Sequence, residues 1–252
     1  MKIPMKKFNE KLVVITGGTS GIGLSTAQAF LDAGAEVWIT GRNAAKLDAA
    51  AQGLNNAKLK TVVSDTSTLE GIARLREAVA ASGRSVDVLF LNAAIATFTA
   101  IAETTEADFD AQFNTNVKGA YFTLQQLLPH LTDAASVIFT SSTNATAAAL
   151  GSSVYSATKG ALNKIAQVAA NELASRKIRV NVVSPGPTET PGLDYAVPNE
   201  AKGYLASITA LQRLAQPTEI AQVVLFLASE DASFISGTEI IADGGLLNFA
   251  TK

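Results

Sequence analysis

The sequence predicts an α/β fold, a doubly wound parallel sheet of about seven strands flanked by helices. Short β-branched runs alternate with helical patterns along most of the chain, and this alternation is typical of stacked βαβ units. The length of 252 residues suits one α/β domain. No linker divides the chain, so we expect a single domain spanning residues 1–252.

Apolar and β-branched runs predict the strands, in chain order: Leu12–Thr16, Glu36–Thr40, Lys58–Val63, Asp87–Leu91, Ser136–Thr140, Ile178–Val183 and Glu239–Ala242. Between them, apolar residues recur at helical spacing and good helix formers are frequent. These patterns predict helices at Ile22–Ala33, Ala44–Gly53, Leu69–Ala81, Glu106–Leu128, Tyr155–Ser175 and Thr218–Ala228. Thr105 with Asp108, three residues on, resembles a capping pair for the longest of these.

The alternation stops between Pro185 and Leu214, where prolines and glycines are expected to interrupt regular structure. About thirty residues then separate a strand from the next helix. A connection of that length inside a compact domain is usually functional. Residues 190–212 are therefore a candidate substrate lid.

Composition excludes several kinds of chemistry. The chain has no cysteine, which removes disulfides, thiolate nucleophiles and thiolate metal sites. His130 is the only histidine, so we expect no metal centre and place His130 at a helix end. A net charge of -2 argues against a nucleic-acid partner. No apolar run is long enough to span a membrane and no secretory signal pattern occurs, so we expect a cytoplasmic protein.

A glycine-rich turn, TGGTSGIG, follows the first predicted strand and opens the first helix. Gly17, Gly21 and Gly23 allow unusual dihedral angles and a close backbone approach, so amides at the helix start can face a pyrophosphate. The spacing is GxxxGxG rather than GxGxxG, and no Gly-Lys-Ser/Thr follows, which excludes a P-loop. A glycine turn alone often serves geometry only, but its place after the first strand favours a dinucleotide.

The end of the second strand, Thr40-Gly41-Arg42-Asn43, carries no carboxylate for ribose hydroxyls. Arg42 instead offers a planar cationic fork suited to a 2′-phosphate. The alternative is an ordinary surface arginine at a strand end. We predict NADP(H) rather than NAD(H).

Tyr155 and Lys159 stand four residues apart, on one face of a predicted helix. A nearby ammonium favours the ionised phenol, so Tyr155 is expected to exchange a proton with a substrate oxygen. The strand before them ends in Ser141-Ser142, at the sheet edge where α/β proteins bind ligands. Either serine could hydrogen-bond a carbonyl, or simply cap the strand end.

These residues resemble the single-domain short-chain dehydrogenase/reductases, whose pattern covers nearly the whole chain. The resemblance implies a Rossmann-type fold and the NADP-preferring branch of that family. It implies a cofactor site made of Gly17, Thr19, Ser20, Gly21, Ile22, Gly23, Arg42, Asp65, Asn92, Tyr155, Lys159, Pro185, Gly186, Thr188 and Thr190. The implied catalytic residues are Asn116, Ser142, Tyr155 and Lys159.

Individual roles follow from the same resemblance. Asp65 is expected to contact the adenine, and Ser142 rather than Ser141 to orient the substrate. Lys159 would also bind the nicotinamide ribose, and Asn116 would hold a water-linked proton relay to the lysine. The carboxamide would be fixed by the backbone at Thr188 and the side chain at Thr190.

One departure from the family pattern follows the fourth strand, where Leu91-Asn92-Ala93-Ala94 replaces Asn-Asn-Ala-Gly. The Cβ of Ala94 is expected to alter how this loop meets the cofactor ribose. Near the C-terminus, the stretches 213–229, 234–237 and 243–245 resemble elements that commonly mediate tetramer contacts. We expect a homo-oligomer, a tetramer or alternatively a dimer.

The sequence thus predicts an NADP(H)-dependent oxidoreductase of the carbonyl reductase or alcohol dehydrogenase type, acting on a small carbonyl or alcohol. Tyr155 would be the general acid in the reducing direction. An alternative is an NADP(H)-binding regulatory or sensor protein with the same fold and little turnover. A methyltransferase would leave Tyr155, Lys159 and Arg42 without a shared role, and a hydrolase would need a GxSxG elbow that is absent.

Overall fold

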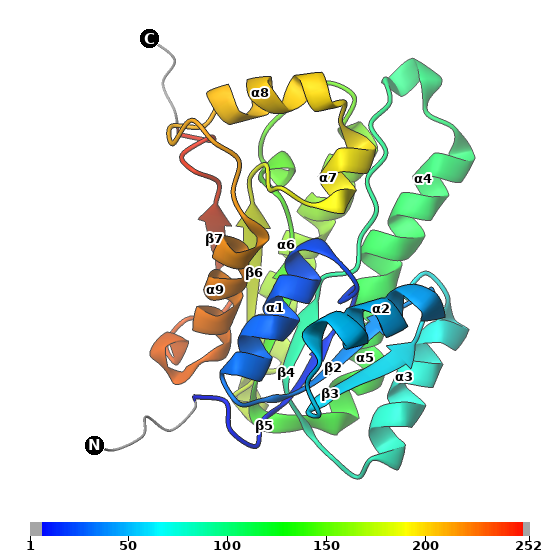
Figure 1. Ribbon diagram of the computed structural model, residues 1–252, viewed down its shortest axis with the longest axis vertical. Coiled ribbons are helices and arrows are strands. Elements are labelled where there is room, and N and C mark those ends of the chain that lie inside the picture. The colour runs from blue at the N-terminus through cyan, green and yellow to red at the C-terminus, as the bar shows by residue number, and fades with distance from the viewer. Residues whose placement is uncertain (1–6, 249–252) are drawn as a thin grey trace.

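The computed structural model describes residues 7–248, so both ends of the predicted domain lie outside the described residues. Seven parallel strands form one sheet in the order β3-β2-β1-β4-β5-β6-β7 (Figure 1). The strands are β1 Leu12–Ile15, β2 Glu36–Gly41, β3 Leu59–Val63, β4 Val86–Leu91, β5 Leu131–Thr140, β6 Arg179–Pro185 and β7 Glu239–Ala242. The predicted doubly wound parallel sheet in a single α/β domain is confirmed.

Helices cover both faces of this sheet. The α-helices are α1 Gly21–Asp32, α2 Ala44–Leu54, α3 Leu69–Ala81, α4 Glu106–Gln112, α5 Gly119–Leu127, α6 Ser153–Glu172, α7 Pro191–Ala196, α8 Asn199–Ser207 and α9 Pro217–Ala228. Short 3-10 turns are η1 Ile101–Glu103, η3 Leu128–His130, η4 Thr143–Ala145, η5 Ala174–Arg176 and η6 Glu230–Ala232. His130 ends η3, as the sequence predicted.

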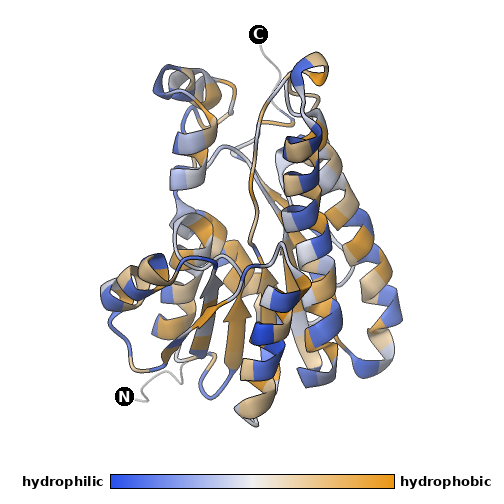
Figure 2. Cartoon of the chain, turned by 90° about the vertical axis from the view of Figure 1, so that its right-hand side faces the viewer, coloured by the Kyte–Doolittle hydropathy of each residue, from blue (hydrophilic) through white to orange (hydrophobic). Residues whose placement is uncertain are grey.

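The core has two layers because successive strand residues point to opposite faces. In β1, Leu12 and Val14 pack with α3, α5 and α6. Val13 and Ile15 pack on the other face, with α1, α2 and α9. The sheet is accordingly the most apolar part of the chain, and the polar helix faces point outward (Figure 2). This burial on both faces explains why the strands are nearly continuous apolar runs.

The long helix predicted over 106–128 is interrupted. Residues Phe113–Lys118 form a π-helical turn, η2, between α4 and α5. A π turn inserts an extra residue into the helix and is frequent at functional sites. The fifth strand was also predicted too short, since β5 begins at Leu131 and pairs there with Val86.

The prediction of no regular structure between Pro185 and Leu214 was wrong, because α7 and α8 both lie there. The prolines begin these helices rather than break them. Pro191 occupies the first turn of α7, behind a Thr190 side chain that accepts a hydrogen bond from the Leu193 amide. Pro198 is the N-cap of α8. A first-turn proline has no helical partner to lose, and its fixed φ suits a helix start.

The sheet changes winding direction between β1 and β4. From β1 the chain runs outward to β2 and β3, and from β4 it runs the other way to β7. Open parallel sheets bind ligands at the carboxyl ends of strands beside such a switch point. Among the helices of residues 7–248, none combines the length and apolar content that a membrane crossing requires.

Candidate active site

The loop from β1 to α1 brings its glycines to the switch point. Gly17 and Gly21 have φ of 68° and 52°, in the left-handed region that favours glycine. A Cβ on Gly23 would lie 2.2 Å from the Gly17 carbonyl oxygen, so no larger residue fits without a shift. The N-cap residue Ser20 makes no side-chain capping bond, and the first turn of α1 carries no acid. Free first-turn amides of this kind can bind an anion. Thr19 lies in the loop before them, Ser20 is the N-cap and Ile22 is in the first turn of α1.

Asn92 ties this loop to the end of β4. Its Nδ2 donates to the carbonyl oxygens of Thr16 and Gly17 at 3.2 and 3.1 Å, and its Oδ1 accepts from Thr140 at 3.3 Å. A Cβ on Gly17 would lie 2.8 Å from the Cα of Ala93. The Asn92 side chain therefore stabilises the glycine loop. Alanine at position 94, where the family pattern has glycine, leaves these hydrogen bonds in place.

Arg42 and Asp65 follow the neighbouring strands β2 and β3. Arg42 is exposed, and no ion pair within residues 7–248 involves it. Asn43, the next residue, caps α2 by accepting from the Lys46 amide at 3.0 Å, which fixes the backbone beside Arg42. Asp65 Oδ1 accepts from both the amide and the hydroxyl of Ser67, at 2.9 and 2.7 Å.

The structure distinguishes the two serines after β5. Ser141 is buried and its hydroxyl donates to the Lys159 carbonyl oxygen at 3.2 Å. Ser142 instead hydrogen-bonds the side chain of Tyr155, and its Oγ accepts from the Asn144 amide at 3.2 Å. The residues at the strand end alone did not decide between Ser141 and Ser142. In the structure, Ser142 is the one beside the Tyr155 phenol.

Lys159 lies under Tyr155 on the same face of α6. Its Nζ is 5.5 Å from the centroid of the Tyr155 ring and donates to the Thr140 carbonyl oxygen at 2.9 Å. The Lys159 side chain is buried, and burial lowers its pKa to about 7. Burial therefore disfavours the charged form of this amine relative to an exposed lysine.

The expectation that this amine makes Tyr155 more acidic is not met. Burial raises the pKa of Tyr155 to about 12, and the hydrogen bond with Ser142 lowers it by less. Within residues 7–248, no hydrogen bond joins Lys159 to the phenol, and the amine itself loses charge. The phenol is therefore neutral near pH 7, which is the form that can donate a proton to a carbonyl oxygen.

Asn116 lies in the π turn and is 1% exposed. Its Oδ1 accepts from the Ile95 amide at 2.9 Å, while its Nδ2 donates to the Ile95 carbonyl oxygen at 2.9 Å and to Thr158 Oγ1 at 3.1 Å. The side chain thus joins the β4–α4 connection to α6 at the residue before Lys159. It makes no direct hydrogen bond with Lys159 in the described part of the chain.

The segment after β6 closes the same edge of the sheet. Gly186 packs so tightly that a Cβ would lie 2.7 Å from the Cα of Asp243. Thr188 is buried, and its hydroxyl donates to the Gly186 carbonyl oxygen at 2.9 Å. A Cβ on Gly21 would lie 3.1 Å from the Thr190 methyl carbon. The start of α7 is therefore in contact distance of the glycine loop.

Sequence reasoning missed two residues at this edge. Phe98 packs its ring edge-on against Tyr155, with centroids 5.6 Å apart and an interplanar angle of 82°. Gln112 is 1% exposed and bonds the backbone of Thr97. Its position four residues before Asn116 places both amides on one helix face, and this spacing was the available signal.

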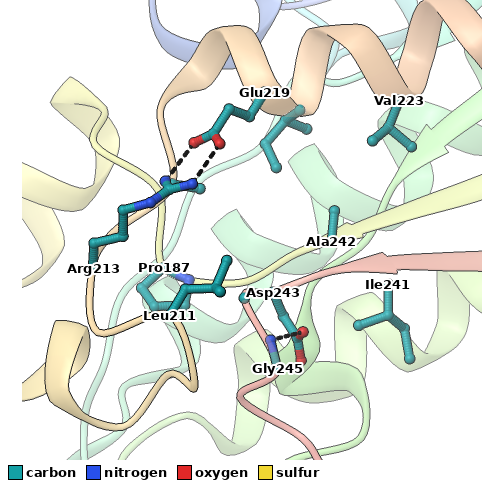
Figure 3. Close-up of a pocket in the computed structure, with 12 residues that line it drawn as sticks. Pro187, Leu211, Arg213, Glu219, Val223, Ile241, Ala242, Asp243 and Gly245 are labelled. Carbon is teal, nitrogen blue, oxygen red and sulfur yellow. Dashed lines mark hydrogen bonds and ion pairs between the residues drawn. The ribbon is translucent and has the colours of Figure 1, made fainter.

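A hollow of about 350 Å³ lies elsewhere, between α9 and the residues after β7 (Figure 3). Arg213 and Glu219 face each other across its rim with two bonds of 2.7 Å. The hydrogen bond from Arg213 is the main reason that the pKa of Glu219 is lowered to about 2. None of the predicted catalytic residues lines this hollow, so it is separate from Tyr155.

This edge of the α/β sheet carries a glycine loop at the switch point, and a Ser-Tyr-Lys cluster formed by the end of β5 and by α6. A family model described as enoyl-(acyl carrier protein) reductase matches residues 17–247. An oxidoreductase of Sarocladium schorii is 37% identical over 244 residues, covering 96% of this chain and 98% of that protein. A 3-oxoacyl-[acyl-carrier-protein] reductase of Thermotoga maritima is 35% identical over 246 residues, covering 96% and 99%.

A solved structure is also similar over most of its length. The 3-ketoacyl-(acyl-carrier-protein) reductase from Brucella melitensis complexed with NADH has a TM-score of 0.87 at 29% identity, covering 94% of this chain and 98% of that one. This chain belongs to the short-chain dehydrogenase/reductase family of oxidoreductases. The family uses a nicotinamide cofactor, and the predicted Rossmann-type fold is confirmed.

Proposed function

We propose that this protein is an NADP(H)-dependent carbonyl reductase or alcohol dehydrogenase in which Tyr155 is the general acid and base. The observation that carries the proposal is the meeting of Ser142, Tyr155 and Lys159 at the carboxyl edge of the sheet. Hydrogen bonds through Thr140 and Asn92 link this cluster to the glycine loop. When bound, the nicotinamide supplies or accepts the hydride. The two similar reductases named above support the reducing direction.

The residues of this chain would handle the proton and the oxygen. Ser142, held by the Asn144 amide, would donate a hydrogen bond to the substrate carbonyl oxygen. Tyr155 is neutral at pH 7, as an ordinary tyrosine is, and would give that oxygen its proton. Lys159, anchored on the Thr140 carbonyl, would bind the nicotinamide ribose, and Asn116 would support a proton relay to this amine through water.

Arg42 supports the preference for NADP(H). Its exposed guanidinium follows β2, where the chain offers no carboxylate for ribose hydroxyls. Such a cation would pair with the 2′-phosphate in a charge-assisted contact. The remaining cofactor contacts are assigned to the glycine loop, Asp65, Asn92 and the segment from Pro185 to Thr190.

Residues 190–212 are proposed as the substrate lid. The segment carries α7 and α8 rather than an irregular loop, and Thr190 at its start contacts Gly21. A lid hinged beside the phosphate loop would close over the nicotinamide and exclude water.

The protein is also proposed to be a homo-oligomer, a tetramer or alternatively a dimer. Exposed apolar side chains on the α9 and β7 side support this, since Phe226 and Ile241 are 40% and 43% exposed. Light scattering during gel filtration measures the subunit number, and a monomer would contradict it.

A panel of ketones, aldehydes and 3-oxoacyl thioesters with NADPH tests the function, with consumption of NADPH as the readout. Turnover of at least one carbonyl, with a lower KM for NADPH than for NADH, is expected. An NADP(H)-binding regulator is the competing function. Tight binding of NADPH without turnover of any carbonyl would favour that alternative.

A further inference from the structure

The ring of Phe98 is the aromatic wall next to the proposed catalytic phenol. It meets the Tyr155 ring edge-to-face at 5.6 Å and 82°, an arrangement that aromatic pairs favour. Phe98 itself is half-buried, so part of its surface is open. A substrate oxygen bound at Tyr155 would bring one of its carbonyl substituents to this surface.

Two buried amides fix the extended chain that carries Phe98. Asn116 makes a pair of bonds with the backbone of Ile95, both 2.9 Å. Gln112 makes the same pair with Thr97, its Oε1 accepting from the amide at 3.3 Å and its Nε2 donating to the carbonyl at 3.4 Å. Gln112 and Asn116 are four residues apart on one continuous helical stretch, and their backbone partners Thr97 and Ile95 are two residues apart on an extended one. The two side-chain amides therefore hydrogen-bond the backbone of alternate residues in the segment that carries Phe98.

The segment is also tied to α6, the helix that carries Tyr155. The Thr99 amide donates to the Gly151 carbonyl oxygen at 2.9 Å, just before α6. Asn116 reaches Thr158 Oγ1 at 3.1 Å, and that hydroxyl donates to the Tyr155 carbonyl oxygen at 2.7 Å. Phe98 and Tyr155 are thus held on one hydrogen-bonded frame, so the wall keeps a fixed position relative to the phenol.

The chemistry of this wall is apolar. No residue from 92 to 102 carries a charge, and the Thr99 hydroxyl is already paired with Thr104 at 3.0 Å. A hydroxylated substituent placed against Phe98 would lose hydrogen bonds to water without replacement. An aromatic or branched apolar substituent would instead gain contact area and ring packing.

We propose that Phe98 determines substrate specificity, selecting carbonyls that bear an aromatic or bulky apolar group over polyhydroxylated ones, and that Gln112 is the positioning residue that holds it. This inference rests on the proposed reductase function. Neither residue belongs to the set of catalytic and cofactor residues assigned above.

Acetophenone and dihydroxyacetone, each reduced with NADPH, are the two probes. In the wild type, kcat/KM for acetophenone should exceed that for dihydroxyacetone by about tenfold or more. Phe98→Ala should raise KM for acetophenone about tenfold and bring the two substrates within roughly threefold. Phe98→Leu, which keeps an apolar side chain, should lie between them. Tyr121→Ala is the control, because it also removes an aromatic ring and Tyr121 is 47% exposed on α5, and it should leave the ratio unchanged.

Gln112→Met keeps the size of the side chain and removes both bonds to Thr97. We expect a raised KM for acetophenone with kcat for dihydroxyacetone unchanged. A purely structural loss would instead lower kcat for both ketones by the same factor, and that result would overturn the positioning role.

Calorimetry of acetophenone binding to the protein saturated with NADP⁺ distinguishes a failure of the reductase function from a failure of the role proposed for Phe98. Binding that Phe98→Ala weakens, together with no turnover of any carbonyl, would reject the reductase function and keep the apolar site. Turnover with an unchanged acetophenone-to-dihydroxyacetone ratio in Phe98→Ala would reject the role of Phe98 and keep the reductase function. A wild type that prefers dihydroxyacetone would also overturn the inference.

Discussion

Replacing Lys159 by methionine should remove a pH dependence of stability that this buried amine imposes. Burial lowers the pKa of Lys159 from 10.5 to about 7, and within residues 7–248 its side chain makes one hydrogen bond, to the Thr140 carbonyl oxygen. The unfolded chain keeps the proton up to the ordinary lysine pKa. Between about pH 7 and 10.5 the unfolded state therefore binds more protons, so the free energy of unfolding rises with pH and falls as pH drops toward 7.

The size of this effect follows from the same interval. Each pH unit inside it changes the free energy of unfolding by about 1.4 kcal/mol. The wild type should therefore gain roughly 2 kcal/mol from Lys159 between about pH 7 and pH 9. The pKa of Tyr155 is raised from 10.0 to about 12, so its effect on the free energy of unfolding changes with pH in the opposite direction. Its contribution is present below about pH 10 and is lost only as pH rises from there toward 12, outside the measured window.

Urea unfolding at several pH values in this window, followed by the fluorescence of the single tryptophan, measures the difference. The curve of stability against pH should be flatter for Lys159→Met than for the wild type. Lys164→Met is the control, because Lys164 is exposed on the same helix, and should keep the wild-type slope. Parallel curves for the wild type and Lys159→Met would refute a buried amine with a lowered pKa.

Three further outcomes are expected. Arg42→Ala should raise KM for NADPH about tenfold to a hundredfold with little effect on NADH, because a charge-assisted bond to the 2′-phosphate is lost; equal effects in steady-state assays of both coenzymes would contradict this. Burial holds the pKa of Tyr155 near 12, so the rate of ketone reduction should stay constant between about pH 7 and 10, where the phenol remains protonated. The rate of alcohol oxidation, which needs the phenolate, should rise with pH. Rate profiles of opposite slope would argue against Tyr155 as the proton donor. Gly23→Ala should weaken NADPH binding in a fluorescence titration, since its Cβ would lie 2.2 Å from the Gly17 oxygen. At Gly53 an added Cβ would meet no neighbouring side chain of residues 7–248 within 4 Å, so Gly53→Ala should bind normally and gain about 0.5–1 kcal/mol of helix stability.

The sheet was predictable because parallel strands buried on both faces must be apolar along their whole length. The bounds of β7 match the prediction, and the other strands differ mainly at their ends. The start of β5 was not predictable, since Thr132 and Asp133 break the apolar run and the pairing of Leu131 with Val86 crosses an irregularity in register. Local pattern carries no information on such a tertiary pairing.

The π turn and the lid helices show the same limit. Apolar spacing across Phe113–Lys118 is compatible with an α-helix, and the extra residue in the turn is visible only in the structure. Two close tertiary contacts occur at this turn. Asn116 accepts a hydrogen bond from the Ile95 amide, and a Cβ added to Gly119 would lie 2.6 Å from the Thr66 carbonyl oxygen. In the lid, prolines predicted to interrupt structure are instead helix-starting residues.

The sequence was sufficient to predict which residues form the candidate site. It was not sufficient to predict how the site changes their pKa values. Spacing on one helix brought Tyr155 and Lys159 together, and the strand end supplied Ser142. Spacing could not give the direction in which the pKa of Tyr155 moves, because burial outweighs the effect of a hydrogen bond there. Phe98 was not predictable either, since its contact with Tyr155 joins the β4–α4 connection to α6, which is distant in the sequence.

The most direct test of the account is single-turnover reduction of a ketone by deuterium-labelled NADPH, with the wild type and Tyr155→Phe compared. Deuterium is expected in the alcohol product of the wild type. Tyr155→Phe should bind NADPH as tightly but transfer deuterium about a thousandfold more slowly, since only the acidic proton has been removed. Transfer at the wild-type rate in Tyr155→Phe would contradict the claim that this phenol protonates the substrate.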